Sequence, residues 1–410
     1  MPLPATMPYP KNQIPSPLDI ASLWKNDPGF VWLDSSSDER EGLAILGRNP
    51  DLILEGHAGE WHLLACELER RKLLCLHSKT HDGAAIGYFR FDGSFRFGFY
   101  DTPLRSSKSW IEEIPVMGGG EVVCDTPVLH FFPEMDRIEY LHMVKRAQEY
   151  VAAGDIYQVC LAHRFQAEFE GDPWGLYLAL RKASPSPHAA YLHLGDETVL
   201  SSSPECFLKM SGQKILTRPI KGTRPRMQSP HEDAQQEFEL KTSPKEIAEL
   251  VMITDLERND LGQVCEYGSV TATQLLELER YAQVFHLVST VEGKLREGIS
   301  QVEALAACFP GGSISGAPKK RALEIIRELE PTPRGLFTGA IGYFGYNGES
   351  QFNIAIRTVV IHREYGDKKS VAQFHVGAGI TADSDPNKEW EETLHKAAGI
   401  LQAARGGKVS

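Results

Sequence analysis

The chain has 410 residues and a formal net charge of −12, with 42% hydrophobic and 24% charged residues. This length and composition are those of a globular protein with one large or two ordinary domains. The negative balance argues against general affinity for nucleic acid or anionic membranes, although a local basic pocket can still hold a small anionic substrate.

No apolar run reaches the roughly 20 residues that a membrane helix needs. The N-terminal stretch "MPLPATMPYPKNQIPSPLDI" has no basic start followed by an apolar core, so it does not read as a secretory signal. We therefore expect a cytoplasmic protein with no membrane segment and no nucleic-acid partner. The seven cysteines are scattered and form no CxxC pair, which predicts reduced thiols and neither a disulfide framework nor a zinc site.

The order of predicted elements favours an α+β fold with antiparallel sheets. Strand-like runs such as "FVWLD", "WHLLACEL", "KLLCLHS" and "FRFGFY" recur from about residue 31 to residue 99. A loop-rich connection over residues 104–130 leads to a helix that ends at Gly154. The remaining helices are expected over about 173–183 and 231–256, after Pro318 and from Pro386, with runs of strands between them. Strands that come in runs, without strict alternation with helices, argue against a doubly wound parallel sheet.

Two of these helices each carry a pair of carboxylates three residues apart. The helix in "SPKEIAELVMITDL" carries Glu246 and Glu249, and the helix in "SDPNKEWEETLHKAAGIL" carries Glu389 and Glu392. Residues three apart share a helix face. Two such faces can jointly hold a hard dication such as Mg²⁺, which prefers a few carboxylate oxygens together with water and an anionic ligand. The spacing alone favours solvated helix faces.

Lys221 lies in "TRPIKGTRPR", among Arg218, Arg224 and Arg226. A lysine attacks an electrophile only as the neutral amine, so its pKa must fall from about 10.4. Burial and repulsion by the three arginines would both lower this pKa. The sequence context alone favours an inert, solvated lysine.

Three further features admit both a structural and a functional interpretation. The glycine-rich stretch "CFPGGSISGAPKKRALEII" enters a helix at Pro318, and its backbone N–H groups can hold a carboxylate or phosphate, although the spacing is not that of a P-loop. His286 lies in an apolar run, where a core histidine is the commoner case. Glu205 follows a proline at a strand break and is either exposed or a carboxylic acid held in a site.

Taken in order, these stretches resemble the chorismate-utilising enzyme family over about residues 135–403. The matching stretches are "GDIYQVCLAHRF", "SSPECFL", "PIKGTRPR", "KEIAELVMITDLERNDLGQV", "VFHLVSTVEG", "FPGGSISGAPKKRALEIIRELEP", "GLFTGAIGYF", "NIAIRT" and "VGAGITADSDPNKEWEETLHKA". The resemblance implies antiparallel sheets packed as a sandwich with helices on the outside. Residues 1–130 would form an N-terminal β-rich part of the same body, and residues 131–410 the chorismate-binding catalytic region.

Within this family, Lys221 together with Gln158 resembles the aminodeoxychorismate synthase component I branch. The resemblance implies that chorismate and ammonia give 4-amino-4-deoxychorismate, for para-aminobenzoate and folate synthesis, through a covalent lysine intermediate. Ammonia would come from a separate glutaminase subunit. The alternatives are anthranilate synthase component I, whose reaction releases pyruvate, and a non-catalytic relative that binds a glutaminase.

The resemblance also implies a role for each candidate residue. Lys221 would attack the ring, Glu205 would protonate the departing hydroxyl and His286 would lie beside the ring. Mg²⁺ would be the cofactor, held by Glu249 and Glu392 and supported by Glu246 and Glu389. The substrate would be held by Ser313, Gly316, Arg357, Gly377, Gly379 and Lys396.

Overall fold

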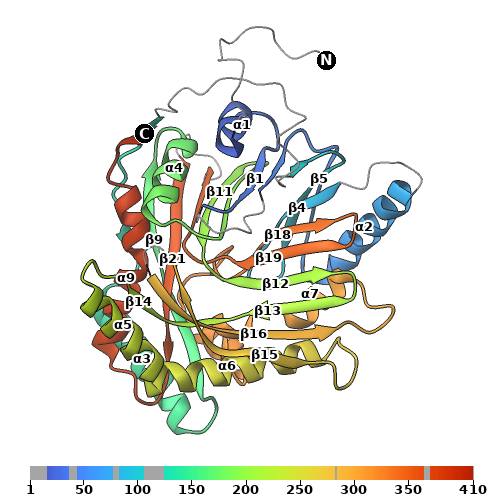
Figure 1. Cartoon of the computed structure of the whole chain (residues 1–410). Coiled ribbons are helices and arrows are strands. Elements are labelled where there is room, and N and C mark those ends of the chain that lie inside the picture. Colours follow the sequence, from blue (N-terminus) through green and yellow to red (C-terminus); the bar gives the residue numbers. More distant parts are fainter. Residues whose placement is uncertain are drawn as a thin grey trace.

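Two large antiparallel sheets form the centre of the protein, with helices on their outer faces (Figure 1). The computed structural model describes residues 16–36, 44–76, 83–105, 124–281, 284–363 and 370–409. Most of the connection predicted over residues 104–130 therefore lies outside the described residues. The α+β fold with antiparallel sheets, predicted from the sequence, is confirmed.

The first sheet joins strands from the N-terminal third to strands from the far end of the chain. At its centre β9 and β21 pair along eleven successive positions, from Phe169 opposite Ser370 to Val159 opposite Ile380. Its strands in spatial order are β17 (Gly316–Ala317), β9 (Gln158–Phe169), β21 (Ser370–Ile380), β20 (Thr358–Arg363), β11 (Glu197–Ser203), β10 (His188–Leu194), β1 (Val31–Asp34), β2 (Ile45–Gly47) and β6 (Leu104–Arg105), with β8 (Phe132–Pro133) beside β9.

The second sheet is built in the same way from distant segments. Its strand β4 pairs with β18, so residues near position 86 lie beside residues near position 343. The strands in spatial order are β14 (Ile220–Pro225), β16 (Val284–Lys294), β13 (Lys214–Arg218), β12 (Cys206–Ser211), β19 (Glu349–Ile354), β18 (Ala340–Gly345), β4 (Ala84–Phe89), β5 (Phe95–Tyr100) and β3 (Leu52–Gly56), with β15 (Thr271–Arg280) beside β16. A separate small ladder pairs β22 (Gly407–Val409) with β7 (Cys124–Thr126).

The apolar core is divided by the sheets into layers. Between the sheets, Val31 and Leu192 of the first meet Ile86 and Ile341 of the second. The outer face of the first sheet packs on α1, α3, α4, α8 and α9, and that of the second on α2, α6 and α7. The helices are α1 (Pro17–Trp24), α2 (Trp61–Leu76), α3 (Arg137–Ala152), α4 (Pro173–Ala183), α5 (Pro230–Thr242), α6 (Pro244–Gly262), α7 (Gln301–Cys308), α8 (Lys319–Leu329) and α9 (Pro386–Ala403), with 3₁₀ turns at Ala58–Glu60 and Gly312–Ile314.

The prediction of short strands recurring over residues 31–99 is wrong at two adjacent runs, "WHLLACEL" and "KLLCLHS". "WHLLACELERRKLLCL" forms the helix α2, which buries Leu64, Leu68 and Arg71 on one face. These residues are spaced by four and three, which is a helical period, and the charged run between them is rich in good helix formers. The helical stretch predicted over 231–256 is two helices, α5 and α6, because Pro244 disfavours helical backbone at Ser243.

Across the described ranges, none of the helices has the length and apolar character needed to cross a bilayer.

Candidate functional site

Lys221 is held inside the protein on β14, next to the helix α6. Its side chain is 15% exposed, and its Nζ lies 3.9 Å from Glu249 Oε2. A Cβ placed on Gly379 of β21 would lie 3.7 Å from the same Nζ. The amine therefore lies where β14, α6 and β21 meet, and the solvated position favoured by its sequence context is wrong.

The three arginines near Lys221 in sequence do not surround its amine, because each is paired with an acid elsewhere. Arg218 pairs with Glu279, Arg224 with Glu246 and Arg226 with Asp233. Burial lowers the pKa of Lys221, but the electrostatic influence of the acidic groups around it, Cys160, Glu249, Glu205 and Glu392, outweighs burial and raises its pKa overall. The lowering of this pKa by arginine repulsion, which the sequence suggested, does not occur in this arrangement.

Glu205 is a buried carboxyl at the entrance to β12. It is 6% exposed, and Ser313 Oγ donates a 2.5 Å hydrogen bond to its Oε1. Burial raises the pKa of Glu205, while the hydrogen bond from Ser313 and the charge of Lys221 partly oppose this. A carboxyl whose protonated form is favoured is suited to deliver a proton to a leaving group.

The carboxylates of α6 and α9 are brought together, and Lys245 bridges the two helices. Its Nζ lies 3.5 Å from Glu389 Oε1 and 3.9 Å from Glu249 Oε1. Farther along α9, Glu392 pairs with Lys396 at 2.7 Å, and Lys396 also donates to the carbonyl of Gly377 at 2.8 Å. The side-chain groups that the sequence placed on two separate helix faces thus share one region.

This region suits a divalent cation in its donor chemistry. Glu249 Oε1 and Glu389 Oε2 are buried and accept no hydrogen bond from the described residues, so each has an oxygen available for another partner. Within the same ranges, no three His, Cys, Asp or Glu side chains are already gathered closely enough to form a metal cluster. Mg²⁺ takes one or two protein carboxylates and completes its shell with water and substrate oxygens, so the residues present fit it.

His286, Arg357 and Gly316 each have a different environment. His286 lies on β16 beside β14, and its Nδ1 is 3.0 Å from Thr223 Oγ1; burial lowers its pKa to about 4, which keeps the imidazole neutral. Arg357 is half-buried with φ = 50°, and its guanidinium has no ion-pair partner among the described residues. Gly316 has a packing reason of its own, because a Cβ there would lie 2.2 Å from the carbonyl oxygen of Gln158.

Two residues of the site were given no catalytic or binding role from the sequence, although Gln158 served to choose a branch of the family. Lys245 directly precedes Glu246 and lies four residues before Glu249, a spacing that could have indicated its ion pair. Gln158 is fully buried, and neither its Nε2 nor its Oε1 has a hydrogen-bond partner among the described residues. Its Nε2 lies 2.2 Å from a Cβ placed on Gly379, so only glycine leaves room for this amide.

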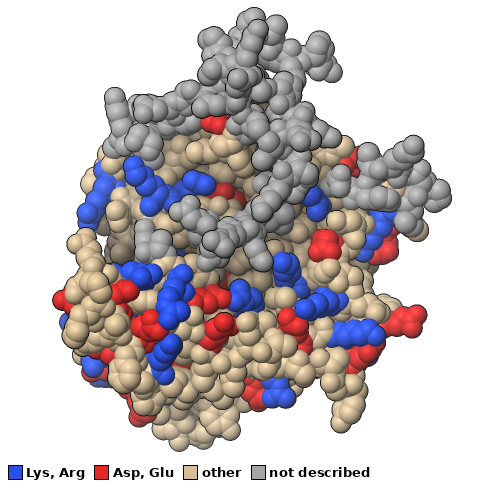
Figure 2. All heavy atoms as spheres, viewed as in Figure 1, with Lys and Arg blue, Asp and Glu red and all other residues tan. Residues whose placement is uncertain are grey.

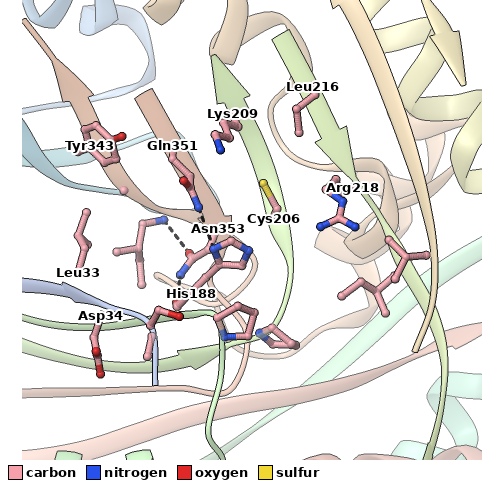
Figure 3. A pocket seen from close by; sticks show the side chains of 18 of the residues that line it. Leu33, Asp34, His188, Cys206, Lys209, Leu216, Arg218, Tyr343, Gln351 and Asn353 are labelled. Carbon is pink, nitrogen blue, oxygen red and sulfur yellow. Dashed lines mark hydrogen bonds between the residues drawn. The ribbon is translucent and has the colours of Figure 1, made fainter. Parts of the chain in front are cut away.

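A separate cavity of about 260 Å³ is lined by Cys206 of β12 and by Leu216 and Arg218 of β13 (Figure 3). Pro204, Cys206 and Ile220 line it, whereas Glu205 and Lys221, their neighbours in sequence, do not. Side chains alternate between the two faces of a strand, which explains the separation of Lys221 from Ile220 on β14. Within the cavity, Asn353 donates to the carbonyl of His188, whose ring contacts Gln351.

On the face of the molecule seen in Figure 2, basic and acidic side chains are interspersed, and neither sign forms a continuous field. Such a surface lacks the broad basic stripe of a nucleic-acid interface. Acidic and basic side chains gather instead in the partly buried cluster around Glu249 and Lys221.

Comparison with known proteins matches residues 123–402 to the chorismate binding enzyme family. Anthranilate synthase component 1 of Synechocystis is 46% identical over 282 residues, which cover 68% of this chain and 55% of the relative. The Thermus thermophilus protein of the same name is 45% identical over 273 residues, covering 67% and 58% respectively. The chain thus spans about half the length of the curated relatives that it matches.

Solved structures of similar fold cover nearly the whole chain. Anthranilate synthase component I from Streptococcus pneumoniae has a TM-score of 0.74 and 26% identity, covering 97% of this chain and 100% of that protein. The menaquinone-specific isochorismate synthase from Escherichia coli has a TM-score of 0.72 and 18% identity, covering 92% and 89%, which shows a shared fold.

These relatives overturn the assignment to the aminodeoxychorismate branch. That assignment rested on Gln158 and Lys221, whereas the similarity to anthranilate synthase component 1 extends over 282 residues. Two positions in one pocket are weak evidence of a branch, because a side chain can differ while the rest of the site is retained. The family resemblance itself is confirmed: the chain belongs to the chorismate binding enzyme family.

Proposed function

We propose that this chain is a chorismate-aminating synthase of the anthranilate synthase component 1 type. The supporting observation is 46% identity to such a protein, together with a family match whose range, residues 123–402, contains every candidate site residue. The buried acid Glu205, the amine of Lys221 and the paired helical carboxylates give the pocket the groups that the reaction needs.

The proposed reaction converts chorismate and ammonia into anthranilate, pyruvate and water. The nitrogen of ammonia bonds to ring C2, the two conjugated ring double bonds each shift by one position toward C4, and the C4–O bond breaks. Hydroxide leaves poorly, so Glu205 donates a proton to the departing oxygen and water is released. Loss of the C2 proton and of the enolpyruvyl group, which leaves as pyruvate, then makes the ring aromatic.

Binding of the two substrate carboxylates is assigned to the charged and small residues around the pocket. Glu249 and Glu392 would hold Mg²⁺, with Glu246 and Glu389 supporting them. When bound, the ion would neutralise the ring carboxylate. Arg357 has no ion-pair partner in the described part of the chain and would hold the other carboxylate. Lys396, Ser313 and the backbone around Gly377, Gly379 and Gly316 complete the binding surface.

Lys221 and His286 are proposed to lie against the ring. Lys221 is oriented by Glu249 and enters the pocket next to Gly379. His286 is neutral and is fixed by Thr223, so it contributes hydrogen bonding without charge. We propose both as catalytic residues.

The nitrogen source is proposed to be a separate glutaminase subunit. Component 1 in the names of the relatives denotes one part of a larger enzyme. With ammonium salts the chain alone should turn over chorismate, and with glutamine it should need the added glutaminase.

The deciding experiment identifies the product. The purified chain is incubated with chorismate, Mg²⁺ and ammonium at mildly alkaline pH. The products are separated by chromatography and identified by mass spectrometry, and the released pyruvate is assayed in parallel. Equal amounts of anthranilate and pyruvate are expected.

A product that retains its enolpyruvyl group, with no pyruvate released, would contradict the proposal. Glu249→Gln serves as the matched negative control, since it keeps the shape of the side chain and removes its charge. Chorismate consumption that is unchanged in this variant would show that the reaction occurs outside the described pocket.

A further inference from the structure

A second group of buried charges lies farther along α6, beyond the carboxylates that face Lys221. Glu257 and Asp260 are each 2% exposed, and Asp260 forms an ion pair with Lys319 of α8. Burying a carboxylate is unfavourable unless hydrogen bonds or charges compensate it. The hydrogen bonds of Glu257 within the described part of the chain go to Gly312 and Thr217, neither of which is a proposed pocket residue, so its burial needs another explanation.

The contacts of Glu257 point to the turn that holds Ser313. The backbone N–H of Gly312 donates to Glu257 Oε1 at 2.9 Å, and Thr217 Oγ1 donates to Oε2 at 3.4 Å. The next residue, Ser313, donates its hydroxyl to Glu205 at 2.5 Å. Glu257 is thus linked to Glu205 through one peptide unit and one side chain.

Glu257 and Leu256 pack closely against this turn at Gly312. A Cβ placed on Gly312 would lie 2.9 Å from Glu257 Oε1 and 2.8 Å from Leu256 Cδ2, distances that real side chains do not adopt. Gly312 begins the 3₁₀ turn Gly312–Ile314, so the carboxylate accepts an N–H group at the start of a turn, where no intrahelical partner exists.

We propose that Glu257 is a positioning residue that fixes the Gly312–Ile314 turn and, through Ser313, the carboxyl of Glu205. A catalytic acid must be held within hydrogen-bond reach of the oxygen that it protonates, and small displacements lower the rate strongly. The inference rests on the proposed role of Glu205 in chorismate turnover. It adds a residue that lies outside the pocket and acts only through this turn.

The electrostatics of the cluster agree with this arrangement. Burial raises the pKa of Glu257 to about 7, with the charge of Asp260 adding to the effect and Lys319 and the Gly312 N–H opposing it. Either protonation state retains an oxygen that accepts the Gly312 N–H, so the link to the turn does not depend on the charge of Glu257.

The test compares two replacements of Glu257 by chorismate consumption with ammonium and Mg²⁺. Glu257→Leu keeps the approximate size and removes the acceptor, and we expect kcat to fall by about 10- to 100-fold, a larger change than any in the KM for chorismate, with the Mg²⁺ affinity unchanged. Glu257→Gln can still accept the Gly312 N–H and should recover most of this loss. Asp260→Asn, which breaks the Lys319 ion pair and leaves the turn alone, is the matched control and should keep kcat.

The same replacement is then made in a Glu205→Gln background, using enzyme at substrate-level concentration to follow slow turnover. If Glu257 acts through Glu205, Glu257→Leu should cause no further loss there, because residues that act as a unit are not additive. A full multiplicative loss in the double variant would overturn the proposal and leave Glu257 a general stabiliser.

Gly312→Ala provides a second variant if Glu257→Leu does not fold. It displaces the turn by steric contact with Glu257 and removes no polar group, so it should reproduce the kcat loss and the non-additivity. Hydrogen–deuterium exchange of the peptide spanning residues 309–318 should be faster in both variants, and unchanged exchange would contradict the inference. None of these outcomes depends on which product forms. A wrong product assignment can therefore be distinguished from a wrong role for Glu257.

Discussion

Glu205 illustrates how a single residue acquires a chemical role from its surroundings. Its burial favours the protonated form, and Ser313 fixes one carboxyl oxygen. We expect Glu205→Gln, which keeps the shape but carries no transferable proton, to lower kcat by about 10²–10⁴-fold. Glu277→Gln, an exposed replacement on β15, is the control. A loss of less than about threefold, with the chemical step limiting, would assign Glu205 a structural role.

The pH profile gives an independent check of the same residue. Because the pKa of Glu205 is raised, the fraction of enzyme with a protonated acid declines as the pH rises through that pKa. Wild-type kcat should therefore fall on the alkaline side of its profile, and this fall should be absent in Glu205→Gln.

Lys221 is largely buried beside Glu249, whereas its sequence context favoured a lysine exposed to solvent. We expect Lys221→Ala to lower kcat/KM for chorismate by at least about tenfold, because it removes the amine held beside Glu249 and Gly379. Unchanged turnover would contradict a catalytic role. Mass spectrometry of the wild-type peptide during turnover then separates the two modes of action: an added mass on Lys221 identifies bond formation, and an unchanged mass identifies an ionic contribution.

At the scale of elements, α6 and α9 meet through their first turns. Ser243 and Asp385 cap these helices, each followed by a proline, so that Glu246 and Glu389 lie in the first turn. The geometry of the pocket therefore depends on where the two helices begin. Lys245 holds them together through its contacts to Glu249 and Glu389.

The two helices should bind Mg²⁺ jointly. Glu249→Gln and Glu392→Gln are each expected to weaken Mg²⁺ binding by tenfold or more, since second-shell changes alone typically cost about 10–100-fold. Titration calorimetry of the substrate-free and chorismate-bound protein measures this without relying on turnover. Glu391→Gln on α9, an exposed neighbour, should leave the affinity unchanged, and equal binding by all three variants would place the ion elsewhere.

The sequence predicts this level of structure well where local chemistry decides it. The helix predicted from Pro386 is α9, which Asp385 caps, whereas the single helix predicted over 231–256 is interrupted at Ser243 and Pro244. The sequence-based prediction failed at α2, where an apolar run resembled a strand until the spacing of Leu64, Leu68 and Arg71 was seen to be helical. The bridge of Lys245 to Glu389 depends on two helices 144 positions apart and is not encoded locally.

The pocket, too, depends on contacts between distant segments that local sequence does not reveal. The alternation of Lys221 with Ile220 follows from strand geometry. Which face of β14 becomes the reactive one depends on the elements packed against it, α6 and β21 of the first sheet. The pairing of Arg218, Arg224 and Arg226 with acids from other elements could not be inferred from the segment that contains them.

At the scale of the whole molecule, stability should depend on buried neutral histidines. His163 is 1% exposed, stacks on Trp390 at 4.9 Å, and burial lowers its pKa to about 4 from 6.5. Between these values the unfolded chain binds a proton that the folded chain does not, so the free energy of unfolding falls as the pH is lowered. One such group contributes about 1.4 kcal/mol per pH unit.

The measurement is chemical denaturation of the wild type and of His163→Gln between pH 7 and pH 4. Buried acids such as Glu257 have raised pKa values and act in the opposite direction, so the difference between the two proteins isolates His163. The wild type should lose more stability than the variant as the pH falls below 6.5. Parallel curves for the two proteins would show that His163 is accessible to protons in the folded state.

The pairing of β4 with β18 has a consequence for biosynthesis. Strand β4 ends at Phe89, and its partner begins at Ala340, about 250 residues later. At a synthesis rate of about 5–20 residues per second, roughly 10–50 s pass between synthesis of β4 and synthesis of β18. The edge of β4 that pairs with β18 stays unpaired with it during this time. During that time Ala85, Tyr88 and Phe89 are presented on an incomplete sheet, a state that favours pairing with other chains. We therefore expect the nascent chain to be held by chaperones and to aggregate most readily when synthesis stops before residue 340.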